Sequence, residues 1–113
     1  MNDWRDLKVM VKALADVARL TIVYHLAHQA EEITVTMLTD LLGLSQPLVS
    51  WHLRKLRRAN LVRTRRVGRQ VYCSLNLDRY QHCLQRLALL VDPAAVVEAP
   101  PVGSLLIDAA LEE

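Results

Sequence analysis

The short connection between two neighbouring helical segments most constrains what this chain can fold into. Apolar residues recur at helical spacing on both sides of Gly43 and Leu44. Thr34 and Ser45 stand where helix N-caps are expected, and Gly43 can adopt the left-handed conformation that ends a helix. Pro47 falls in the first turn of the second helix, where its missing amide costs little. Because only two residues separate the segments, the sequence predicts a helix-turn-helix unit.

The remaining periodicity completes the expected fold. Helical spacing predicts three further helices, at about 3–14, 16–29 and 77–91. After Asn60, which can take a left-handed conformation, the pattern alternates and predicts strands at 61–66 and 70–75 around a turn at Gly68. The predicted fold class is mainly α with a small β-hairpin, with about five helices and a two-stranded wing.

Charge is separated along the chain although the net charge is only +2. Eight of the fourteen Lys and Arg residues fall between positions 54 and 69, and no acidic residue occurs from Leu41 to Leu77. A solvated helix and hairpin would explain a charge run alone, but such surfaces usually mix both signs. The separation therefore favours a polyanionic partner, and with the helices it favours nucleic acid.

The segment 45–58 has two distinct faces at about 100° per residue. Val49, Leu53 and Leu56 form the face expected to be buried. The opposite face carries an aromatic ring, cations and a hydroxyl, from Pro47, Ser50, Trp51, Arg54, Lys55 and Arg58.

Exposed Trp on a basic helix is unusual unless a partner covers it. In a major groove the Trp51 ring could contact a thymine methyl or sugar, Arg54 or Lys55 could reach guanine or phosphate, and Gln46 could pair with adenine or phosphate. The alternative is that Trp51 folds back on its own domain. His52 lies at the edge of the buried face, where a hydrogen-bonded structural histidine is favoured over a ligand.

Several segments together resemble the ArsR/SmtB family of winged-helix repressors. They are Lys12-Ala13-Leu14-Ala15-Asp16 with Arg19-Leu20; Leu42-Gly43-Leu44-Ser45-Gln46-Pro47-Leu48-Val49-Ser50-Trp51-His52-Leu53; and Leu56, Leu61-Val62, Gly68-Arg69 and Val71-Tyr72-Cys73-Ser74-Leu75. The resemblance covers about residues 10–80. The sequence departs from the family's pattern at three positions. Val17 stands where the family commonly has Pro, Asn60 stands where it usually has Gly, and Trp51 is a bulky residue at a position that varies in the family.

This resemblance implies operator binding by the 45–58 helix, a wing at 67–70, and a dimer built mainly from the first and last helices. The expected DNA contacts are Ser45, Gln46, Pro47, Ser50, Trp51, His52, Arg54, Lys55, Arg58, Arg65 and Arg69. The expected dimer contacts are Trp4, Leu7, Val11, Tyr80, Cys83, Leu84, Leu87 and Val91.

The sensor sites that the resemblance would imply are missing from the sequence. No thiol occurs in the third helix at 34–40, and Asp78 and His82 are four apart where the zinc-type pattern has two. We therefore expect no metal and no cofactor. His25 and His28 with Glu31 or Glu32 could bind a metal, but a polar helix end is the favoured reading.

A thiol switch using Cys83, beside His82, and Cys73 is a second possibility for sensing. Buried, inert thiols are the favoured reading, since Cys73 alternates with Val71 and Leu75.

Composition and motifs argue against three other classes of protein, namely secreted proteins, membrane proteins and enzymes. Early charges argue against a signal peptide, no apolar run could span a bilayer, and two cysteines suit a reducing cytoplasm. No nucleophile, phosphate-loop or zinc-protease motif indicates an enzyme. We expect a DNA-binding and dimerisation domain at 1–91 and a tail at 92–113, whose apolar patch at 105–107 could pack on the dimer.

The sequence thus predicts a cytoplasmic, homodimeric, sequence-specific DNA-binding repressor of a palindromic operator, without the familiar metal sites. Its alternatives are a thiol-responsive repressor and a basic interaction module without DNA specificity.

Overall fold

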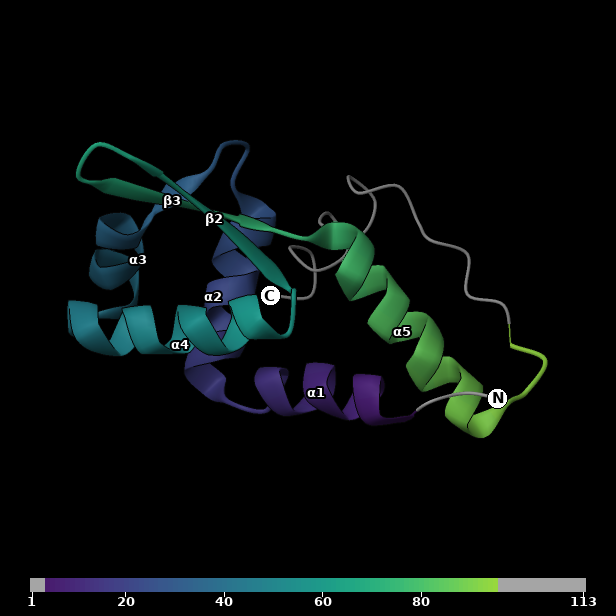
Figure 1. Cartoon of the computed structure of the whole chain (residues 1–113). Coiled ribbons are helices and arrows are strands. Elements are labelled where there is room, and N and C mark those ends of the chain that lie inside the picture. The colour runs from purple at the N-terminus through teal and green to yellow at the C-terminus, as the bar shows by residue number, and fades with distance from the viewer. Residues whose placement is uncertain (1–3, 96–113) are drawn as a thin grey trace.

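The computed structural model describes residues 4–95, which form five helices and a small antiparallel sheet at one edge of the molecule (Figure 1). The elements are α1 (Trp4–Leu14), α2 (Val17–His28), β1 (Ile33–Thr34), α3 (Val35–Leu42), α4 (Gln46–Arg58), β2 (Val62–Val67), β3 (Gln70–Leu75) and α5 (Leu77–Val91). The expected winged helix-turn-helix architecture is confirmed, with α3 and α4 as the helix pair and β2–β3 as the wing.

The predicted caps set the helix boundaries. The side chains of Asp16, Thr34 and Ser45 each accept a hydrogen bond from the backbone amide three residues later, at 3.1, 3.1 and 3.4 Å. Gly43 ends α3 with φ 66°, the left-handed conformation that only glycine adopts without strain. Local sequence chemistry therefore fixes the three-residue turn, 43–45, between α3 and α4.

The sheet has three strands in the order β1-β3-β2, so β1 adds a third strand, which was not expected, to the two-stranded wing formed by β2 and β3. Ile33 and Thr34 pair with Cys73 and Tyr72 on the inner edge of β3. A strand of two residues is too short to show an alternating pattern, and it follows the polar pair Glu31-Glu32. Its pairing is therefore a tertiary contact that periodicity alone does not reveal.

Two apolar clusters hold the described residues together. The larger one joins α2, α3, α4 and the sheet through fully buried side chains, including Ile22, Ile33, Leu38, Val49, Leu56, Leu61 and Cys73. The smaller one consists of Leu7, Met10 and Cys83, where α1 packs on α5. The recognition unit and the α1–α5 pair thus have separate cores.

A polar junction fixes the start of α5 to the end of α4. The buried Asn76 side chain donates to the Asn60 carbonyl oxygen at 2.9 Å and accepts from the Arg79 amide at 3.4 Å. Arg79 donates to the Ala59 carbonyl oxygen at 3.2 Å and to both Asp6 carboxylate oxygens at 3.0 and 2.6 Å. One guanidinium therefore joins α1, α4 and α5.

Most of the predicted 92–113 tail, including its apolar patch at 105–107, lies outside the described residues. Within residues 4–95, no helix has the length and apolar character to cross a membrane.

Candidate DNA-binding surface

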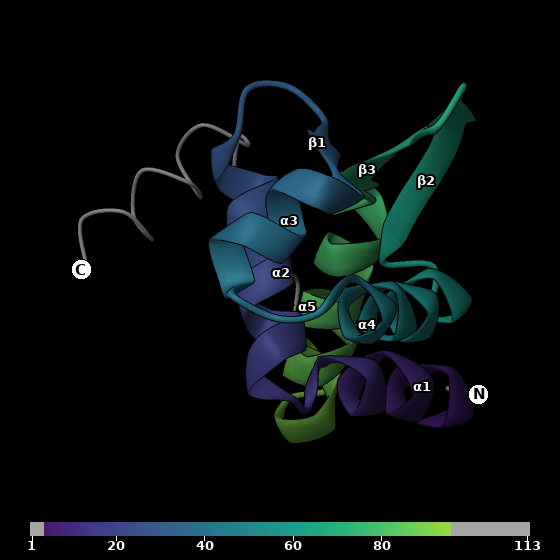
Figure 2. The same ribbon diagram turned by 90° about the vertical axis from the view of Figure 1, so that its left-hand side faces the viewer.

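Buried contacts orient α4 so that its basic side faces outward. Val49 and Leu56 are fully buried and Leu53 is nearly so, as the sequence predicts. The polar and aromatic side chains opposite them are exposed or half-buried: Gln46, Pro47, Ser50, Trp51, Arg54, Lys55 and Arg58. Figure 2 shows α3 and α4 on the same side of the molecule, below the projecting β2–β3 hairpin.

Trp51 occupies the centre of this outer face. Its ring is 43% exposed, so the side chain neither stands free in solvent nor folds into the core. Lys55 Nζ lies 5.1 Å and Arg19 Cζ 5.6 Å from the ring centroid, both within cation–π range. The aromatic ring and two cations form one compact group, which can offer a flat apolar surface and positive charge together.

His52 points inward and is only 6% exposed. Its Nδ1 atom lies 3.5 Å from Arg19 Nη1 and 3.7 Å from Asp16 Oδ2. Because guanidinium only donates, Nδ1 accepts in this arrangement. The expected structural histidine is confirmed, and we correct the contact set by removing His52, since a buried ring cannot reach a DNA base.

Arg19 is a member of this surface that the sequence reasoning missed. It sits three residues after the N-cap Asp16, and its side chain crosses from α2 to Trp51 and His52 on α4. The local spacing shows a helix start, but the contact with α4 spans 33 positions. Only the packing of α2 on α4 brings these residues together.

The wing carries one arginine that is ion-paired within the chain, Arg65, and one that is exposed at the turn, Arg69. Arg65 contacts Glu32 twice, with Nη2 and Nε at 2.7 and 2.8 Å from Oε1, and its Cζ lies 4.7 Å from the Tyr72 ring centroid. The hydrogen bond that Arg65 donates to Glu32 raises the pKa of the Arg65 guanidinium. Arg69, by contrast, is exposed beside Gly68, whose φ of 60° forms the hairpin turn. The expected phosphate contact at Arg65 therefore competes with an ion pair within the chain.

The wing and the reading helix share one end of the molecule. In Figure 1 the hairpin tip and the N-terminal end of α4 lie at the same end of the molecule, with α3 between them, while α5 extends toward the opposite end. Arg57 on α4 also donates to the Thr64 hydroxyl on β2 at 3.4 Å. Basic groups from both elements are therefore presented on a common side.

Both cysteines are buried free thiols. Burial raises the pKa of Cys73 to about 11 and also raises that of Cys83. They belong to different apolar clusters, so the structure does not pair them. The expected burial of both thiols is confirmed, and their low reactivity in the folded chain stays a prediction.

The remaining candidate ligands are occupied by local contacts. His28 Nδ1 lies 2.7 Å from the Tyr24 carbonyl oxygen, and its ring stacks on the Tyr24 ring at 4.0 Å. In residues 4–95, no three His, Cys, Asp or Glu side chains lie close enough together to hold a metal ion.

The expected dimer residues fall into three groups by their exposure. Leu7 and Cys83 are 5% and 2% exposed within one chain, where they hold α1 against α5, so we remove them from the proposed interface. Tyr80 and Leu84 are half-buried. The others keep apolar surface in solvent, namely Trp4, Val11, Leu87 and Val91, and Leu90 joins them at 54% exposure.

This geometry defines a winged helix-turn-helix DNA-binding domain. The family described as "Bacterial regulatory protein, arsR family" matches residues 16–64, from the cap of α2 into β2. The chain belongs to the ArsR family and is a transcription regulator.

Similar proteins share this architecture. The nodulation protein NolR of Rhizobium meliloti is 39% identical over 94 residues, which cover 81% of this chain and 75% of that protein. A transcriptional repressor SmtB homolog of Synechocystis is 48% identical over 66% of this chain, but the match spans only 55% of that protein. The crystal structure of NolR from Sinorhizobium fredii has a TM-score of 0.61 at 36% identity, covering 80% of this chain and 88% of that one.

Proposed function

We propose that this regulator is a cytoplasmic homodimeric repressor that binds a palindromic operator through α4 and the wing. The outer face of α4 is the observation that carries this proposal. It presents Trp51, Arg54 and Lys55 beside Gln46 at the helix start, within a stretch from Leu41 to Leu77 that contains no acid. Function here is binding, with no role for catalysis.

Each part of the surface has a distinct task in this proposal. Gln46, Trp51, Arg54 and Lys55 contact base edges in the major groove, because their types match the acceptors and methyl groups displayed there. Ser45, Pro47, Ser50 and Arg58 contact the sugar–phosphate backbone at the groove edge. Arg65 and Arg69 contact phosphates from the wing and contribute affinity without sequence preference.

Dimerisation places two such surfaces on one DNA duplex. The exposed apolar side chains of α1 and α5, at the end of the molecule away from the wing, support a two-fold interface there. Two α4 helices related by a two-fold axis meet half-sites about 10 base pairs apart, which is why the operator is palindromic.

Selection from a random duplex library with the full chain tests the proposal. We expect enrichment of an inverted repeat with half-sites about one helical turn apart. At one fixed salt concentration, the selected duplex should bind at least about a thousandfold more tightly than a scrambled one. Repression should then be lost when this sequence is changed in a reporter promoter.

The variant Arg54→Ala provides the matched comparison with Arg69→Ala. The first should alter which base is enriched at one position of each half-site, and the second should weaken all duplexes similarly. Binding that does not discriminate between duplex sequences would contradict the proposal and identify a basic interaction module instead.

A further inference from the structure

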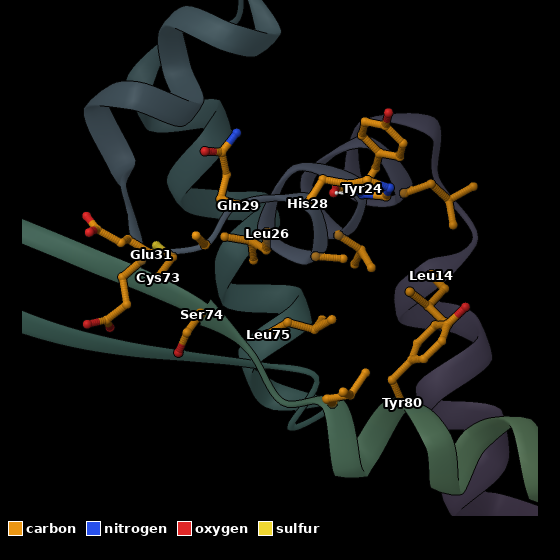
Figure 3. A pocket seen from close by; sticks show the side chains of 16 residues that line it. Leu14, Tyr24, Leu26, His28, Gln29, Glu31, Cys73, Ser74, Leu75 and Tyr80 are labelled. Carbon is orange, nitrogen blue, oxygen red and sulfur yellow. Dashed lines mark hydrogen bonds between the residues drawn. The ribbon is translucent and has the colours of Figure 1, made fainter. Parts of the chain in front are cut away.

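A cavity lies on the side of α2 away from α4, bounded by α2, the loop after it, β3 and the start of α5. Its volume is about 580 Å³. This volume falls within the range of about 300–1,000 Å³ that is typical of small-molecule sites. Figure 3 shows Leu26 and Leu75 in the middle of the cavity, between Glu31 at one end and Tyr80 at the other.

The two ends of the cavity differ in chemistry. Leu14 and Tyr80 lie at one end, where the lining is apolar and aromatic. Glu31 and Glu32 lie at the other end, and no Lys or Arg lines the cavity among the described residues. The site therefore combines an apolar body with a negatively charged end.

His28, which also lines the cavity, has a buried hydrogen-bond acceptor. Its Nδ1 contacts the Tyr24 carbonyl oxygen at 2.7 Å, and a carbonyl can only accept, so Nδ1 carries the proton. Nε2 is then an acceptor, and it is buried without a hydrogen-bond partner. A buried acceptor of this kind is costly unless a donor reaches it.

We propose that this cavity binds a small amphipathic organic cation. The apolar body of the ligand packs between Leu26 and Leu75, and its ammonium group lies at Glu31 and Glu32. Charge complementarity selects this class of ligand, because Glu31 adds a negative charge to the carboxylate that Glu32 shares with Arg65, and no Lys or Arg lines the cavity among the described residues. Nε2 of His28 is buried, so this ligand does not reach it.

The same site is connected to the wing. Glu32 lines the cavity and also holds Arg65 of β2, at 2.7 Å. An ammonium group beside Glu32 competes with the Arg65 guanidinium and releases it toward DNA phosphate. This second step rests on the proposed function; binding of the cation does not.

An NMR titration of the full chain without DNA tests the binding step. The probes are 4-phenylbutylamine and 4-phenylbutyrate, which share an apolar body and differ in charge. The amine should shift the amide signals of Leu26, Ala27, Ser74 and Leu75 with a dissociation constant in about the millimolar range. The carboxylate should bind at least about fivefold more weakly.

Matched variants separate the charge from the cavity. Glu31→Gln should remove most of the preference for the amine, whereas Asp40→Asn, which removes an exposed acid on α3 outside the cavity, should leave it unchanged. Ala27→Leu should fill part of the cavity and weaken both probes together. Thermal unfolding of each variant without probe checks that it is folded.

Three results would overturn the assignment. The first is that the amide signals of the cavity residues do not shift, and the second is that the amine and the carboxylate bind with equal affinity. The third is that the shifts depend on the concentration of the protein rather than on that of the amine. The last result would show that a second copy of the chain fills the cavity. If the amine binds but leaves the salt dependence of operator binding unchanged, the connection through Glu32 and Arg65 fails while the binding site stands.

Discussion

At the scale of single residues, Trp51 gives the clearest indication of what kind of partner binds this surface. Its ring is held by Arg19 and Lys55 at a surface that is otherwise basic, yet 43% of it remains in solvent. Covering that surface against a base or sugar in a groove would bury apolar area and keep both cations near phosphates. The position of the ring thus favours DNA over an acidic protein surface, which would leave its flat face without a matching groove.

Trp51→Ala should lower operator affinity by about 1–3 kcal/mol, which is roughly a 5- to 150-fold loss. Fluorescence anisotropy with the selected duplex at fixed salt measures the change. Trp4→Ala is the matched control, because Trp4 is similarly exposed at 41% but lies on α1. An unchanged affinity for Trp51→Ala in a folded protein would remove this ring from the interface.

The buried thiols lead to a second residue-scale prediction. Because burial raises the pKa of Cys73 to about 11, almost none of its thiol is deprotonated at neutral pH. Iodoacetamide should therefore label neither Cys73 nor Cys83 in the folded chain at pH 7 over minutes, but both in urea. Mass spectrometry counts the labels. Fast labelling of either thiol without unfolding would revive the thiol-responsive alternative.

At the scale of elements, the wing contains its own counterion. Glu32 precedes β1, and the β1–β3 pairing brings it to Arg65 on β2, 33 positions later in the chain. The ion pair is at the surface, so its effect on stability is small. Its effect on binding is larger in principle, because it neutralises one of the cations that the wing can offer to phosphate.

Glu32→Gln should therefore strengthen operator binding at low salt. If Arg65 gains one phosphate contact, the slope of log affinity against log salt should steepen by about 0.9. Anisotropy titrations at several salt concentrations provide the slope. Glu31→Gln removes an equal charge next to the same strand without touching Arg65, and it should steepen the slope less. Equal slopes for the two variants would argue against a specific role for the Glu32–Arg65 pair.

The elements also show what the sequence can and cannot reveal. Caps at Asp16, Thr34 and Ser45, the glycine stop at Gly43 and the buried stripe of α4 are local patterns, and all were predictable. Strand β1 and the contacts of Arg19 with Trp51 and His52 depend on which elements pack together. No spacing rule contains that information, because the partners are separated by tens of residues.

At the scale of the whole molecule, the Asp6–Arg79 ion pair joins α1 to α5, and the same guanidinium contacts the end of α4. The Arg79 guanidinium holds the pKa of Asp6 below its ordinary value of 3.8. A depressed pKa means that the charged form is favoured in the folded state. The resulting stability is present above about pH 4 and is lost as the pH falls below 3.8, through the folded pKa.

Asp6→Asn should remove this pH-dependent contribution. The difference in thermal stability between the wild-type chain and the variant should be constant from pH 5 to 7 and should shrink below about pH 4. Calorimetry across this range measures it. Asp40→Asn is the control, because Asp40 is exposed and has no such partner in the described structure. The thermal stability of this variant should change with pH in the same way as that of the wild type. A difference that grew toward low pH would contradict the sign of this linkage.

The exposed apolar surface of α5 gives a prediction about assembly. Leu87→Glu should convert the dimer into a folded monomer, because a carboxylate in an apolar interface is strongly unfavourable. Sedimentation measures the mass, and circular dichroism checks the helix content. Leu41→Glu alters a side chain of similar exposure on α3, at the other end of the molecule, and should leave the mass unchanged. A dimer that survives Leu87→Glu would place the interface elsewhere.

The polar junction at Asn76 and Arg79 has a consequence for operator spacing. Because it fixes the start of α5 to the end of α4, the separation of the two α4 helices in a dimer is set by how the two α5 helices pack. A rigid dimer of this kind matches one spacing between half-sites and fits the neighbouring spacings poorly. Inserting a single base pair between half-sites, which moves them by about 3.4 Å and turns them about the duplex axis, should therefore defeat binding even though every contacted base is retained.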